Sequence, residues 1–139
     1  MMQVRPALLS FVAVVVLAGC APATIEGVRQ APAGHETLVL DQPYQQVYRT
    51  VVTNARRCYQ TGMVTAQMVV TGDLYTDTQT GQVTVALHGG LGVDTYMGVD
   101  IKALDDKRSQ VDTFVSLSTW TRALPMVKRW LTQGDTPCG

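Results

Sequence analysis

A change of hydrophobic period near Gly62 is the feature that most constrains the fold. Before it, apolar side chains recur at spacings of three and four, which is typical of one face of an α-helix. These side chains are Tyr44, Val47, Tyr48, Val51, Val52, Ala55, Cys58 and Tyr59. After it, apolar and polar side chains alternate, as in half-buried β-strands. The pattern therefore predicts a helix over residues 43–61 and a run of strands after it.

The alternating part of the chain divides into four expected strands, over residues 67–77, 81–88, 95–105 and 109–119. Short polar turns join them, which predicts an antiparallel meander. A further strand is expected at residues 36–41 and a second helix at 122–133. The predicted order is β-α-β-β-β-β-α. It corresponds to an α+β two-layer sandwich, in which an antiparallel sheet of about five strands carries two helices on one face.

The first 20 residues have the organisation of an export signal. A short head carries Arg5, and residues 7–18 form an almost wholly apolar run of 12. A helix that crosses a bilayer needs about 20 such residues, whereas the apolar core of a secretory signal has about 7–15. The run ends in Leu17-Ala18-Gly19-Cys20.

This tetrad resembles the lipobox of bacterial lipoproteins. The resemblance implies that residues 1–19 are a signal peptide, removed by cleavage before Cys20. It further implies that the thiol of Cys20 receives a diacylglycerol and that its new amino group is acylated. Residue 21 is Ala, not Asp. An Asp there resembles the inner-membrane retention signal of enterobacterial lipoproteins, so its absence implies the outer membrane, with the domain in the periplasm.

Two stretches of the first predicted helix extend this resemblance. Residues 44–49 read Tyr-Gln-Gln-Val-Tyr-Arg, and residues 55–59 read Ala-Arg-Arg-Cys-Tyr. With the predicted order of elements, they resemble small proteobacterial outer-membrane lipoproteins of uncharacterised function. The layout is also similar to the helix-and-sheet domains of the BamC type.

Residues 21–35 are rich in Pro, Gly and Ala and show no apolar period, which is typical of a tether. The expected organisation is a signal peptide over residues 1–19, a lipidated tether over 20–35 and a single α+β domain over 36–139. Two cysteines remain in that domain, Cys58 and Cys138. An even pair in an exported domain predicts a disulfide. The open alternatives are two buried free thiols and a reactive Cys58.

The composition and motifs favour a non-enzymatic protein. The 11 Lys and Arg residues balance the 11 Asp and Glu residues, which argues against a nucleic-acid partner. No spacing of acidic residues or cysteines predicts a metal site, and we expect no cofactor besides the covalent lipid. His88 precedes Gly89-Gly90-Leu91-Gly92, which resembles an oxyanion loop of esterases. However, no serine after Cys20 lies in a G-x-S-x-G turn.

The outward face of the predicted sheet mixes aromatic and polar side chains and is our expected binding surface. It comprises Tyr96, Asp100, Lys102, Asp112 and Phe114. Our leading hypothesis is a lipid-anchored module that binds an unidentified envelope protein, in envelope assembly or maintenance. The alternative is a periplasmic binder of a small molecule or glycan. A hydrolase around His88 is the third hypothesis.

Overall fold

The structure is a computed structural model that describes residues 20–134 and 137–139. Its elements, in chain order, are α1 (Ile25–Gln30), β1 (Gly34–Leu40), α2 (Tyr44–Tyr59), β2 (Thr61–Met63), β3 (Ala66–Tyr75), β4 (Thr80–Gly89), β5 (Gly92–Ala103), β6 (Ser109–Val115), the 3-10 turn η1 (Ser118–Trp120) and α3 (Ala123–Gln133).

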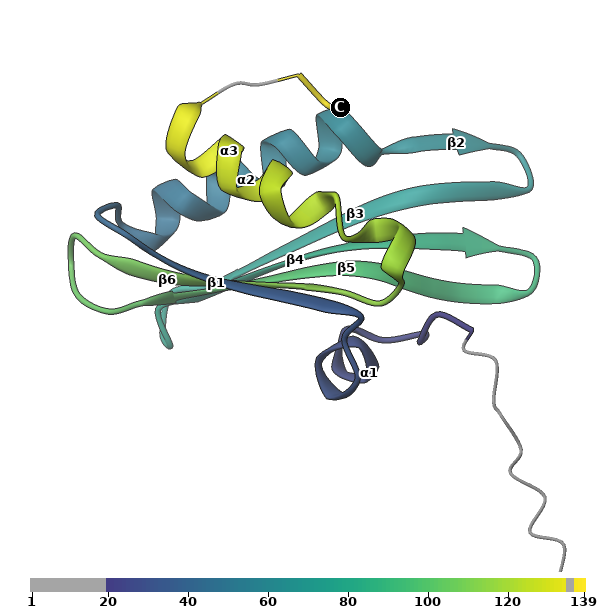
Figure 1. Cartoon of the computed structure of the whole chain (residues 1–139), viewed down its shortest axis with the longest axis horizontal. Helices are drawn as coiled ribbons and strands as arrows, with labels where there is room; N and C mark the ends of the chain where they lie inside the picture. Colours follow the sequence, from purple (N-terminus) through teal and green to yellow (C-terminus); the bar gives the residue numbers. More distant parts are fainter. Residues whose placement is uncertain (1–19, 135–136) are drawn as a thin grey trace, which may run out of the picture.

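The strands form one antiparallel sheet in the order β1-β6-β5-β4-β3-β2. Helices α2 and α3 cover one face of this sheet, and α1 lies against the other (Figure 1). The predicted α+β class is confirmed. The sheet has six strands instead of about five because the short β2 adds to one edge.

The core lies between the sheet and the helices α2 and α3, where the apolar face of the predicted helix packs on the apolar face of the predicted strands. Val47, Val51 and Ala55 of α2 are fully buried, and so are Val83 and Val85 of β4. On β6, buried and half-buried residues alternate along the whole strand, as a period of two requires. Helix α2 ends two residues before the predicted boundary at 61, because residues 61–63 pair with β3.

The segment expected to be a tether is ordered and packed from Pro22 onward. Thr24 caps the N-terminus of α1 through a hydrogen bond that its hydroxyl accepts from the Gly27 N–H. Val28 of this short helix is fully buried. The backbone N–H of Thr95 in β5 donates to the Pro22 carbonyl over 2.7 Å. Residues 22–30 are therefore part of the domain.

A glycine in β5 makes room for α1. A Cβ atom added to Gly98 would lie 1.7 Å from Cδ1 of Ile25, far inside the contact distance of two carbon atoms. Ile25 thus occupies the volume that any larger residue at position 98 would need. One turn away, Arg29 forms two hydrogen bonds with the carboxylate of Asp100, over 2.7 and 2.6 Å.

We expect Gly98→Ala to displace α1 from the sheet. The added methyl overlaps Ile25, and overpacking of this kind costs about 1–3 kcal/mol of unfolding free energy. Hydrogen exchange measured by mass spectrometry should be faster over residues 22–30. Gly90→Ala is the matched control, since a Cβ at Gly90 meets nothing within 4 Å. Unchanged exchange in Gly98→Ala would show that this contact does not hold the helix.

Candidate functional site

The sequence predicts a disulfide and a lipid attachment site at the cysteines of this chain. Cys58 and Cys138 form the disulfide expected from the sequence, with Cα atoms 5.2 Å apart and a separation of 80 positions in the chain. A loop of that length stabilises a fold by about 4.5 kcal/mol in the chain-entropy model. Cys20 is an exposed free thiol, and its lipidation stays a prediction. The predicted signal peptide, residues 1–19, lies outside the described residues.

The predicted binding surface divides between the two faces of the sheet. On β4 and β5 the register shifts, so that Val85 lies opposite Met97 but Ala86 lies opposite Thr95. Tyr96 is the extra residue of this bulge, and an extra residue interrupts the alternation of faces. Its ring therefore stacks on Trp120, 4.9 Å between centroids, instead of joining Asp100 on the open face. The expected placement of Tyr96 is corrected accordingly.

Three of the predicted residues do meet on the open face, the side of the sheet that carries α1. Asp100, Lys102 and Asp112 line a shallow groove of about 330 Å³, together with Arg29 and Tyr75. The carboxylate of Asp100 accepts hydrogen bonds from Arg29, and these bonds raise the pKa of the Arg29 guanidinium. The groove therefore holds a carboxylate that is already paired within the chain.

Asp112 and Phe114 are likewise engaged by neighbours on β1. Partial burial acts to raise the pKa of Asp112, but hydrogen bonds with Thr37, Gln110 and His35 lower it below its usual value. The imidazole of His35 lies flat on the ring of Phe114, with centroids 4.4 Å apart. Internal contacts thus occupy these two predicted binding residues, whereas Lys102 is exposed.

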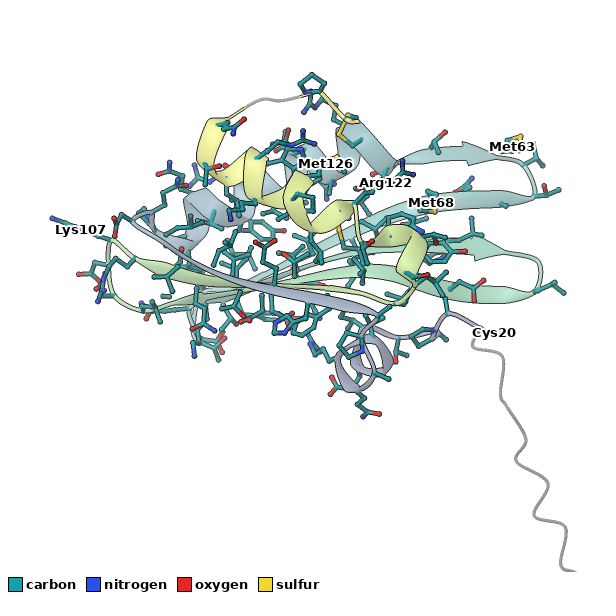
Figure 2. All side chains as sticks on the ribbon, in the orientation of Figure 1. Cys20, Met63, Met68, Lys107, Arg122 and Met126 are labelled. Carbon is teal, nitrogen blue, oxygen red and sulfur yellow. A yellow bond between two sulfur atoms is a disulfide. The ribbon has the colours of Figure 1, made fainter. Side chains whose placement is uncertain are left out.

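A larger cavity, of about 800 Å³, lies where the end of α2, η1 and the start of α3 come together beside the disulfide. Its lining consists of Tyr59, Thr119, Trp120, Arg122, Ala123, Pro125, Met126, Arg129, Cys138 and Gly139. Figure 2 shows Arg122 and Met126 near one another on the helix-covered side of the sheet. Two aromatic rings, a thioether and two guanidinium groups therefore border one hollow.

Aromatic contacts fix the wall of this cavity. Trp120 stacks on Tyr96 on one side and contacts Tyr59 on the other, with 5.2 Å between the centroids of the second pair. Tyr59 in turn meets the buried Trp130 of α3 edge to face, at 6.3 Å. A row of four rings thus runs from β5 through η1 and α2 to α3, and tilted and offset pairs of this kind are favourable.

The cavity combines a neutral phenol with a positive rim. Burial raises the pKa of Tyr59 to about 12, partly offset by the positive charge of Arg122. Arg122 and Arg129 are both exposed. At neutral pH the site therefore offers a hydroxyl, apolar ring surface and two cations, which suits a ligand with an apolar group and a carboxylate.

This cavity was not predicted from the sequence. The available signal was a cluster of two tryptophans and three basic residues within positions 120–130. Trp and Arg are the types most enriched at binding sites between proteins. The disulfide brings Cys138 to these residues, and the end of α2 brings Tyr59. Both contacts join distant parts of the sequence, so no local pattern predicts them.

The other chemical motifs form no site within residues 20–134 and 137–139. His88 is exposed near the end of β4, opposite Gln67 and Val93. The hydroxyl of Ser109 donates to the Gln42 carbonyl. Over the same described residues, no three His, Cys, Asp or Glu side chains are grouped as metal ligands. Nor does that part of the chain contain a helix with the length and apolar character needed to cross a membrane.

Tyr59 should make the fold sensitive to alkaline pH. Its pKa is about 12 in the folded chain and 10.0 ordinarily, so the unfolded chain loses this proton first. The free energy of unfolding should therefore fall as pH rises from about 10 to about 12. Tyrosinate absorbance should show a late-titrating phenol that is lost in Tyr59→Phe and kept in the control Tyr75→Phe. A late phase that survives Tyr59→Phe would contradict the assignment.

Comparisons of this chain with models of protein families, with curated proteins and with solved structures found no match.

Proposed function

We propose that this chain is a non-enzymatic lipoprotein, anchored in the bacterial outer membrane by lipid on Cys20. Its α+β domain would act in the periplasm as a binding module for an envelope protein, in envelope assembly or maintenance. The resemblance of residues 17–20 to a lipobox supports the anchor, as does the exposed free thiol of Cys20. The disulfide supports an oxidising compartment outside the cytosol.

The composition of the 800 Å³ cavity carries the binding part of the proposal. Tyr59, Trp120, Met126, Arg122 and Arg129 are of the types that concentrate at the centres of protein interfaces. The stacked rings are already ordered, so little side-chain entropy would be lost on binding. We infer that the partner presents an apolar side chain next to a carboxylate.

The volume of the cavity favours a second candidate function. Small-molecule sites usually enclose about 300–1,000 Å³ and are mostly apolar with a few polar groups. The cavity, at about 800 Å³, lies within this range. A periplasmic anionic molecule or a glycan fragment is therefore the alternative ligand.

The anchor is tested by the intact mass of protein purified from native membranes. We expect a chain that begins at Cys20 and carries a diacylglycerol and an acyl group. Two alkylations should appear after reduction and not before, because Cys58 and Cys138 are joined. Cys20→Ser should leave the protein unlipidated and release it from membranes. A full-length, unmodified chain would refute the anchor.

The cavity is tested by photo-crosslinking in cells. A photoreactive amino acid replaces Thr119, which lines the cavity, or Thr76, an exposed threonine of the β3–β4 turn, as the control. We expect a protein-sized adduct from position 119 alone, with a lower yield in Arg122→Glu/Arg129→Glu. An adduct of small mass would instead support the second candidate. Equal adducts from both positions, or none, would overturn the cavity as the binding site.

A further inference from the structure

Two hairpin turns expose large apolar side chains at one end of the sheet. In the β2–β3 turn, Val64 is fully exposed and Met63 is 76% exposed. In the β4–β5 turn, Leu91 is fully exposed. Apolar side chains gathered in one exposed place commonly mark a contact with a protein or a membrane.

The two turns are neighbours. Ala66 of β3 pairs with Gly89 of β4, so each strand reaches its turn at the same level of the sheet. A Cβ built on Gly89 would lie 3.8 Å from the carbonyl oxygen of Thr65, so the backbones beside the two turns run close together. Residues 61–67 and 89–93 contain no charged side chain. We call this uncharged pair of turns the hairpin tips.

Cys20 leaves the domain at the same end. Pro22, two residues after Cys20, accepts a backbone hydrogen bond from Thr95, which lies three positions after Gly92 at the start of β5. Figure 2 places Cys20 and Met63 toward one end of the sheet and Lys107 at the opposite end. The turn at that opposite end contains Asp105, Asp106, Lys107 and Arg108. Both ends expose apolar side chains, but only the opposite end carries charged side chains in its β5–β6 turn.

The packed segment leaves little free chain between the domain and Cys20. An extended chain spans at most about 3.3–3.6 Å per residue, so two residues reach about 7 Å. A lipid on Cys20 would therefore hold this end of the domain against the bilayer, whereas a tether of 15 residues would let it stand about 20 Å away.

We propose that the hairpin tips are a second membrane contact, in which Met63, Val64 and Leu91 enter the lipid surface next to the acylated Cys20. The proposal rests on the lipid anchor of the proposed function. The occupant is a bilayer because the anchor brings one to this end, and because the tips present apolar groups without charge. Insertion to the boundary between headgroups and acyl chains, about 5–10 Å deep, is what short apolar segments achieve.

The test attaches the chain that begins at Cys20 to phosphatidylcholine vesicles, through its thiol and a maleimide lipid. Leu91→Trp reports on the tips, and Leu104→Trp reports on the opposite end, where Leu104 is also exposed. We expect lipids brominated on their acyl chains to quench Leu91→Trp at least about twofold more than Leu104→Trp. Equal quenching would overturn the proposal.

Hydrogen exchange gives a second readout that leaves the tips unaltered. On attachment to vesicles, amides of residues 61–66 and 88–93 should exchange several-fold more slowly. Val64→Ser/Leu91→Ser should abolish this slowing, whereas Val39→Ser/Leu104→Ser, which alters exposed apolar residues elsewhere, should retain it. No slowing in the unaltered chain would also overturn the proposal.

The chemical attachment separates the two proposals. It holds Cys20 at a bilayer whether or not cells acylate this residue. Failure of the tips to insert would thus refute the second membrane contact alone. An unmodified native mass would refute the anchor, even if the tips insert when the chain is attached to vesicles.

Discussion

Residues 22–30 dock on the open face of the sheet, and this contact fixes the end of the sheet at which Cys20 leaves the domain. Burial of Val28 is its main source of stability, since a fully buried valine contributes about 1.5–3 kcal/mol. The ion pair between Arg29 and Asp100 is partly exposed, and pairs in contact with water contribute about 0–1 kcal/mol. The pair therefore fixes the register of α1, while apolar contacts hold it in place.

The same docking changes the meaning of the predicted binding surface. Alternation along β5 and β6 correctly places Asp100, Lys102, Asp112 and Phe114 on one face. It does not reveal that residues upstream in the chain supply their partners, because Arg29 and His35 come from a segment without a hydrophobic period. The sequence pattern predicts that this face is exposed to solvent. In the structure, the residues that precede the sheet cover part of it.

The parts of the fold that the sequence pattern does not predict have identifiable physical causes. Helix α1 has six residues, too few for a period of 3.6 to be recognised, and lies among Pro, Gly and Ala. Strand β2 has three residues and no alternation. Tyr96 changes face because a bulge inserts one residue, an event decided by pairing with β4. The long elements α2, α3 and β3 to β6 were predictable because burial repeats along them many times.

The cavity and the hairpin tips consist of different residues, so a ligand in the cavity and a bilayer at the tips could be bound at the same time. The tips are the turns in which β2, β3, β4 and β5 end or begin. Residues of α2, η1 and α3 line the cavity, and α2 and α3 cover one face of the sheet (Figure 1). If the tips meet the bilayer, the strands approach it end-on and neither sheet face lies against the lipid. In that orientation the cavity and its two arginines would lie to the side of the domain and not toward the membrane. A single lipid on a long tether would leave that orientation undefined, whereas the proposed anchor on Cys20, two residues before the docked Pro22, would restrict it.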